Sequence, residues 1–162
     1  MSQNNLKLIR NTYLKVLFIL HQNQFIMNSN KFLIGGIVGG VVFFALGYVF
    51  YGLLLKSFFA DNGMSVDMEK MVWWALIVSN LAFGFLLAYI LGKANASSMG
   101  GGATIGFVVG LLMGLSYDLM MYAMGGGMNF KGIAADVVTG AVLSAIAGAA
   151  IVWVGSMGKK AA

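Results

Sequence analysis

The chain has 162 residues, of which 60% are hydrophobic and only 9% are charged, whereas soluble domains carry about 25% charged residues. This composition excludes a water-soluble fold, because it does not supply a polar surface for a chain of this length. The net charge of +5 comes from residues scattered along short polar segments rather than from a basic stripe with interleaved aromatics, so we expect no nucleic-acid partner.

Residues 1–31 form a polar, basic N-terminal tail. Apolar side chains recur in it at helical spacing, which favours a short amphipathic helix on an anionic membrane surface: Leu6, Ile9, Tyr13, Leu17 and Leu20. Disorder of the tail is an alternative interpretation. A further alternative is that residues 1–26 are an over-extended gene start, since the segment Met27–Lys31 leads directly into the first apolar stretch.

Four apolar stretches follow the tail, and each is long enough to cross a bilayer. A hydrocarbon core about 30 Å thick requires about 20 apolar residues in a helix. The stretches run over Phe32–Leu55, Met71–Leu91, Gly102–Met124 and Gly132–Val154. We therefore predict an all-α fold, a four-transmembrane-helix bundle formed by residues 32–154 and surrounded by lipid.

The distribution of Lys and Arg predicts the orientation of these spans. The N-terminal tail, the loop near Lys93 and the C-terminal tail 155–162 hold seven basic residues, and the two other loops hold three. Because basic loops remain on the cytoplasmic side, both termini are predicted to be cytoplasmic in a bacterial inner membrane. Without residues 1–26 the count falls to four against three, and the asymmetry becomes small.

The connections between the stretches are short, and aromatic residues lie near the span ends. Asp61-Asn62-Gly63 predicts a turn within the longest connection, and Gly125-Gly126-Gly127 predicts another. Residues Gly92–Gly101 are interpreted as a flexible polar link. Aromatics of this kind are typical of membrane interfaces: Trp73, Trp74, Trp153, Tyr51, Tyr89 and Tyr122.

Glycine is unusually abundant, with 23 residues, although it costs about 1 kcal/mol relative to alanine inside a helix. Small residues four apart allow membrane helices to approach closely, and such series predict glycine-mediated packing, a glycine zipper. The predicted packing residues are Gly36 and Gly40 in the first span and Gly102, Gly106, Gly110 and Gly114 in the third. Assembly of several copies through one such face is the alternative.

Two acidic residues lie inside the apolar stretches. Asp118 is in the third span, where a carboxylate costs on the order of 3 kcal/mol on insertion scales and is therefore a functional candidate. Asp136 lies near the start of the fourth span, so the two acids can share a depth in the membrane. Asn80 and Thr139 are predicted to complete this intramembrane polar site.

Each acid also has a structural interpretation. In the first turn of its helix, Asp136 would offset the helix dipole. Asp118 would act as structural polar glue by a hydrogen bond to Asn80 or Tyr117. Lys131 is close enough along the chain to pair with either acid.

The segment Gly47–Gly52 (GYVFYG), followed by Lys56–Phe59 (KSFF) and Trp73-Trp74, resembles a family of small bacterial four-helix integral membrane proteins of unknown function. In that family an aromatic-rich first span ends in tyrosine and glycine before a Phe-containing loop. The resemblance covers about Asn28 to Val154 and implies a four-span fold, with no established activity or catalytic residues. Tyr48 departs from the family pattern, in which tryptophan is commoner at this place.

Two functional hypotheses follow. The first is a small integral inner-membrane protein with a structural, accessory or partner-binding role. The alternative is a small proton- or ion-coupled transporter that uses Asp118. For either hypothesis, the expected partner besides the lipid bilayer is a further copy of the chain or another membrane protein. An enzyme is disfavoured because the chain has no cysteine and its single histidine, His21, lies in the tail; for the same reason we expect no cofactor and no metal.

Overall fold

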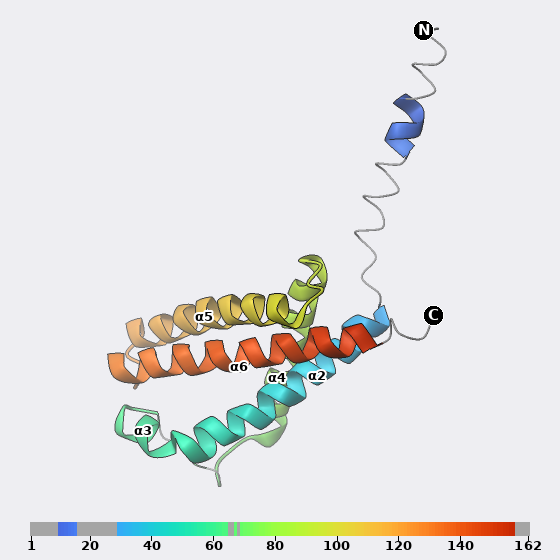
Figure 1. The fold of residues 1–162 in the computed structure, drawn as a ribbon. Coiled ribbons are helices and arrows are strands. Elements are labelled where there is room, and N and C mark those ends of the chain that lie inside the picture. The colour runs from blue at the N-terminus through green and yellow to red at the C-terminus, as the bar shows by residue number, and fades with distance from the viewer. Residues whose placement is uncertain (1–9, 16–28, 65–66, 68, 158–162) are drawn as a thin grey trace, which may run out of the picture.

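The computed structural model describes residues 10–15, 29–64, 67 and 69–157. All regular structure in these residues is helical: α2 (Ser29–Gly47), η1 (Tyr48–Leu54), α3 (Lys56–Asp61), α4 (Trp73–Lys93), α5 (Met99–Ala123) and α6 (Phe130–Met157) (Figure 1). Four helical segments are long and apolar enough to cross a membrane, namely α2 with η1, α4, α5 and α6. The predicted all-α fold with four spans is confirmed.

The outer parts of the chain are described only in part. Of the predicted N-terminal tail, residues 10–15 are helical and Ser29–Lys31 belong to α2. The rest of the tail lies outside the described residues, as do residues 158–162. The first three residues of the predicted C-terminal tail, up to Met157, belong to α6.

Two of the three predicted connections have the expected form, and one is shorter than predicted. Gly63 and Gly125 adopt positive φ angles of 100° and 82°, as tight turns require. The predicted link Gly92–Gly101 is wrong at both ends, because α4 continues to Lys93 and α5 begins at Met99. Ser98 caps this helix, since its hydroxyl accepts a hydrogen bond of 3.1 Å from the Gly101 amide.

The helices form two antiparallel pairs joined through α6. Helix α5 packs along α6, and α2 packs along α4 (Figure 1). Helix α6 also contacts α2, whereas α4 makes far fewer close contacts with α5 and α6. Half of the residues in the most apolar part of α6 are buried inside the bundle, compared with about a fifth in each other span. Helix α6 is therefore the central helix.

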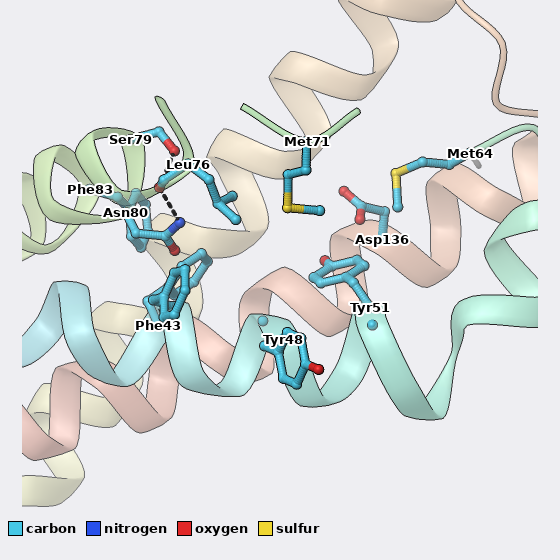
Figure 2. Close-up of a pocket in the computed structure, with 13 residues that line it drawn as sticks. Phe43, Tyr48, Tyr51, Met64, Met71, Leu76, Ser79, Asn80, Phe83 and Asp136 are labelled. Carbon is cyan, nitrogen blue, oxygen red and sulfur yellow. Dashed lines mark hydrogen bonds between the residues drawn. The ribbon is translucent and has the colours of Figure 1, made fainter. Parts of the chain in front are cut away.

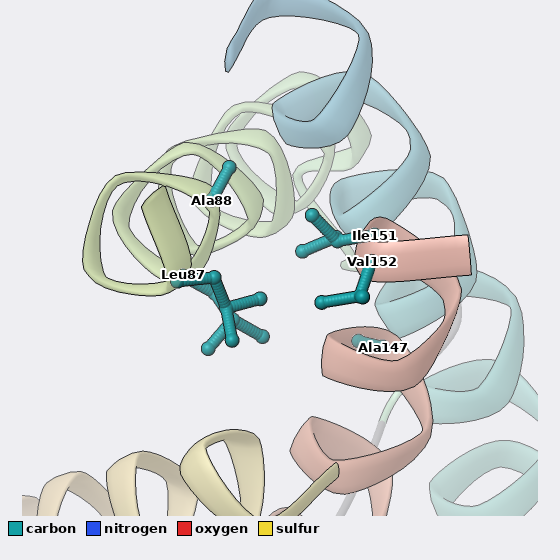
Figure 3. Packing of buried hydrophobic residues seen from close by; sticks show 6 residues of the cluster. Leu87, Ala88, Ala147, Ile151 and Val152 are labelled. Carbon is teal, nitrogen blue, oxygen red and sulfur yellow. The ribbon is translucent and has the colours of Figure 1, made fainter. Parts of the chain in front are cut away.

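The apolar core lies where α4 faces α6 near the end of the bundle at which α6 terminates. Leu87 and Ala88 of α4 lie beside Ala147, Ile151 and Val152 of α6 (Figure 3). Leu91 of α4 belongs to the same buried cluster. Gly35 of α2 also approaches Ile151, which places the start of α2 beside the end of α6. The opposite end of the bundle, which we call the α3 end, holds η1, α3 and the turn between α5 and α6.

Small residues line the contact between α5 and α6. A Cβ added to Gly106 would overlap the Ser144 carbonyl oxygen, and one added to Gly102 would lie 2.6 Å from the Gly148 carbonyl oxygen. A Cβ on Gly110 would collide with the Ser144 side chain, whereas one on Gly114 would lie 3.5 Å from Val137, an ordinary contact. The two backbones therefore touch directly over three of the four glycines.

The contact between α2 and α4 has the same character. A Cβ on Gly40 would lie 2.9 Å from the Leu81 Cα atom, and one on Gly36 would overlap the Phe85 ring. Gly84 of α4 faces the backbone of Gly36 and Gly40. It stays a prediction that glycine drives the association of the helices, and the substitution Gly106→Ala in α5 tests it.

The outer faces of the spans are apolar. Exposed side chains occur on all four spans: Leu33, Val41, Ile77, Phe107, Leu112 and Val138. An apolar surface of this extent is stable in lipid but not in water. The fold is therefore that of a membrane protein.

Candidate functional site

The first span ends in a π-helical segment that places aromatic side chains toward the bundle. In η1 the hydrogen bonds skip one residue more than in an α-helix, and the Leu55 amide donates to the Phe50 carbonyl at 2.7 Å. Gly47 and Gly52 lie at and within this segment and weaken the α-helical preference locally. Single π-helical turns occur frequently at functional sites.

A carboxyl pair lies beside η1. Asp118 of α5 and Asp136 of α6 are close enough for a side-chain hydrogen bond. The Tyr51 hydroxyl of η1 approaches Asp136 in the same way, and Figure 2 shows the Tyr51 ring next to the Asp136 carboxyl group. Three spans thus contribute one polar side chain each to a single site.

Asp118 is the most enclosed member of the site. Its exposed fraction is 2%, and its Oδ2 atom is buried without a hydrogen-bond partner among the described residues. Leaving a buried carboxyl oxygen unpaired is costly. The predicted residue is therefore placed where a polar group has a high energetic cost, which is typical of a functional position.

Asp136 connects this pair to a cavity of about 450 Å³. The wall is predominantly aromatic and sulfur-containing, and Asp136 is the acidic residue on it (Figure 2). The cavity lies between α2–η1 and α4 and extends to the loop between α3 and α4; its larger side chains are Phe43, Phe44, Tyr48, Tyr51, Met64, Met71 and Phe83. Small-molecule sites commonly have volumes of about 300–1,000 Å³ and mostly apolar walls.

The two other predicted polar residues occupy different positions. Asn80 lines the same cavity as Asp136, but its amide donates to the Leu76 carbonyl of its own helix at 2.7 Å. In Figure 2 Asn80 lies beside Phe43, at the opposite side of the cavity from Tyr51. Thr139 is buried on α6, one turn beyond Asp136. The structure thus brings Asp118 and Asp136 together and leaves Asn80 and Thr139 at the margins.

Three details of the structural interpretations of the acids are wrong, while a structural role of Asp118 as such is untested. Asp136 is not in the first turn of its helix, because α6 begins at Phe130. The neighbour of Asp118 is Asp136 rather than Asn80 or Tyr117, and Tyr117 is 60% exposed. In the part of the chain that the structure describes, Lys131 forms no ion pair with Asp118 or Asp136.

The α3 end of the bundle is fastened by two asparagines. The Asn129 side-chain amide donates to the Asn62 side-chain oxygen at 3.0 Å, and the Asn129 backbone amide donates to the Asn62 carbonyl at 3.1 Å. The Asn129 side chain also caps α6 by accepting from the Lys131 and Gly132 amides. The loop after α3 is thereby attached to the turn between α5 and α6.

Helix α3 covers the site through a single buried ring. Phe59 is 1% exposed, and its ring centroid lies 5.0 Å from that of Tyr51. Its neighbour Phe58 is 40% exposed. Phe59 therefore fills the space beside the tyrosine that contacts Asp136.

Sequence reasoning missed the role of Tyr51 and Phe59. It assigned Tyr51 to the membrane interface, yet the side chain is half-buried and contacts Asp136. The two glycines near Tyr51, at positions 47 and 52, are the signal that could have indicated an irregular span end. Trp73, Trp74 and Trp153 are exposed, as interfacial residues are.

The chain matches no family model, and comparison with curated proteins and with solved structures finds no similar chain. The resemblance to small bacterial four-helix membrane proteins thus stays an expectation, and the function is argued from the site.

Proposed function

We propose that this membrane protein is a small proton-coupled carrier whose substrate binds in the cavity and whose proton is held by Asp118 and Asp136. The observation that supports this proposal is the adjacency of the buried Asp118 to Asp136, which itself lines the cavity. A structural or accessory role, the other hypothesis from the sequence, requires neither an enclosed carboxyl pair nor a cavity beside it.

The chemistry of the pair explains how protons and substrate would be linked. An ionised carboxylate only accepts hydrogen bonds, so a hydrogen bond between two carboxyl groups requires a proton on one of them. A pair that holds one proton has a charge of −1, and a pair that holds two is neutral. Because Asp136 lines the cavity, the number of bound protons sets the charge presented to the substrate.

The proposal includes the assembly and location predicted from the sequence. We place the chain in a bacterial inner membrane with both termini in the cytoplasm, since basic residues are concentrated near the termini and Lys93. The N-terminal end of the first span and the C-terminal end of the fourth span lie on the same side of the bundle (Figure 1), as an even number of spans requires. The proposed carrier is non-enzymatic and assembles as a homo-oligomer, which native mass spectrometry in detergent tests.

The test is proton movement in proteoliposomes that contain a pH-indicator dye and carry an imposed pH gradient. Three aromatic compounds of different charge are added in turn: ethidium, anilinonaphthalene sulfonate and uncharged phenylnaphthylamine. We expect at least one of them to accelerate proton movement with the wild-type chain but not with Asp118→Asn. Asp67→Asn, which alters an exposed acid in the loop after α3, is the matched control and is expected to behave like wild type. Equal rates in wild type and Asp118→Asn with all three compounds would contradict the proposal.

A further inference from the structure

The lining of the cavity indicates the chemical class of its ligand. Aromatic rings from two spans form the wall: Phe43, Phe44, Tyr48, Tyr51 and Phe83. Phe43 and Phe83 are packed together with ring centroids 4.6 Å apart. Their faces and edges suit aromatic or alkyl groups of a ligand.

The polar and aromatic groups on the cavity wall indicate the sign of the ligand's charge. Asp136 is the acidic residue on the wall, and no lysine or arginine is among the described lining residues. Aromatic faces attract cations through their quadrupole, and the attraction is stronger in a desolvated site than in water. An anion would meet the carboxylate and the negative faces of the rings, so both features disfavour it.

The groups that face Asp136 also favour a positively charged ligand. Tyr51 of η1 and Asp118 of α5 contact it, and Met64 and Met71 come from the loop between α3 and α4 (Figure 2). The nearby Lys131 side chain is exposed and pairs with neither acid. A compensating cation is therefore missing from the described surroundings of the pair.

We infer that the cavity binds a monovalent organic cation with apolar substituents, with the cationic centre against Asp136 and the substituents among the rings of α2, η1 and α4. This inference rests on the proposed function and names the substrate class of that site. Binding and proton release balance: the neutral pair loses a proton to water and becomes a monoanion, and the bound cation restores neutrality.

The test compares two ions of the same shape and opposite charge, tetraphenylphosphonium and tetraphenylborate, in equilibrium binding to the full-length chain in detergent. We expect saturable binding of tetraphenylphosphonium and at least about tenfold weaker binding of tetraphenylborate. Asp136→Asn is expected to weaken tetraphenylphosphonium binding about tenfold. The control Asp61→Asn, which alters an exposed acid at the end of α3, is expected to leave it unchanged.

A second variant pair does not depend on the carboxyl groups. Tyr48→Leu removes a partly exposed ring from the cavity wall, and Tyr117→Leu removes an exposed ring from α5 outside the wall. Only Tyr48→Leu should weaken tetraphenylphosphonium binding, by a few-fold. Equal binding of both ions, or cation binding unaffected by Asp136→Asn and Tyr48→Leu, would overturn the inference; a cavity that holds a lipid acyl chain would give this result.

The outcomes separate the inference from the proposed function. Cation-selective binding without linked proton movement would support the cation site and refute the proton-coupled carrier. Proton movement driven only by an anionic or uncharged compound would support the carrier and refute the cation site.

Discussion

Gly106 is the residue at which α5 and α6 leave the least room for a side chain. An added Cβ would overlap the Ser144 carbonyl oxygen, and a backbone atom cannot move away as a flexible side chain can. At Gly140 of α6 an added Cβ would meet no atom within 4 Å. Substituting Gly106 therefore tests the close contact between the helices, whereas substituting Gly140 tests helix propensity alone.

We predict that Gly106→Ala lowers the free energy of unfolding by about 2 kcal/mol, because α5 and α6 must separate to accommodate the methyl group. Gly140→Ala should leave the free energy unchanged or raise it slightly, since alanine favours a helix. Both values are measured by unfolding the chain in mixed detergent with increasing dodecyl sulfate. Equal effects of the two substitutions would show that close glycine contact does not stabilise the bundle.

The second residue-scale prediction concerns the proton shared by the carboxyl pair. We predict that the infrared spectrum contains a carbonyl band of a protonated carboxyl group that is lost in Asp118→Asn, because this variant removes the enclosed acid and leaves only Asp136, which lines the cavity. Asp67→Asn, outside the spans, should retain the band. A band of equal strength in both variants would show that the proton lies elsewhere.

At the scale of elements, α3 and η1 hold the site through Phe59. This ring is buried beside Tyr51, whereas the adjacent Phe58 is partly exposed. We predict that Phe59→Ala lowers the free energy of unfolding by about 3 kcal/mol, the usual cost of emptying a buried phenylalanine site. Phe58→Ala should cost much less.

Hydrogen exchange monitored by mass spectrometry shows which part of the chain is destabilised by Phe59→Ala. In Phe59→Ala the amides of α3 and η1 should exchange faster, while those of α5 and α6 retain their protection at positions away from Asn129. Uniformly faster exchange along the whole chain would contradict a local role of α3.

The extent to which the sequence predicts each element follows from the physics of lipid. The four spans are predictable because an apolar helix of sufficient length is the simplest way to satisfy backbone groups in a bilayer. The depth of Asp118 and Asp136 follows from their distance to the span ends, so their proximity is also predictable. The helix start at Met99 was misplaced because the cap by Ser98 makes glycine residues 100 and 101 helical.

Other features depend on contacts that the sequence does not reveal. The π-helical hydrogen bonds of η1 leave no hydrophobic periodicity, so the direction of Tyr51 was not predictable. The burial of Phe59 and not Phe58 depends on how α3 turns back onto the bundle. The Asn62–Asn129 hydrogen bonds join residues 67 positions apart, a pairing that only the fold establishes.

For the whole molecule, the orientation in the membrane is open to a direct test because the chain lacks cysteine. We predict that a cysteine at Ser98, between α4 and α5, reacts with a membrane-impermeant maleimide only when the cytoplasmic side is accessible. A cysteine at Asp61, at the α3 end, should react in intact cells with a permeabilised outer membrane. The reverse pattern would place the termini outside and contradict the positive-inside prediction.

The central claim is that proton binding by the carboxyl pair and ligand binding in the cavity are linked. The most direct measurement is the release of protons from the purified chain in weakly buffered detergent solution when tetraphenylphosphonium is added. We predict that the wild-type chain and Asp61→Asn release protons in proportion to the bound cation, whereas Asp118→Asn and Asp136→Asn release far fewer. Proton release that is absent in the wild type, or equal in all four chains, would contradict the account.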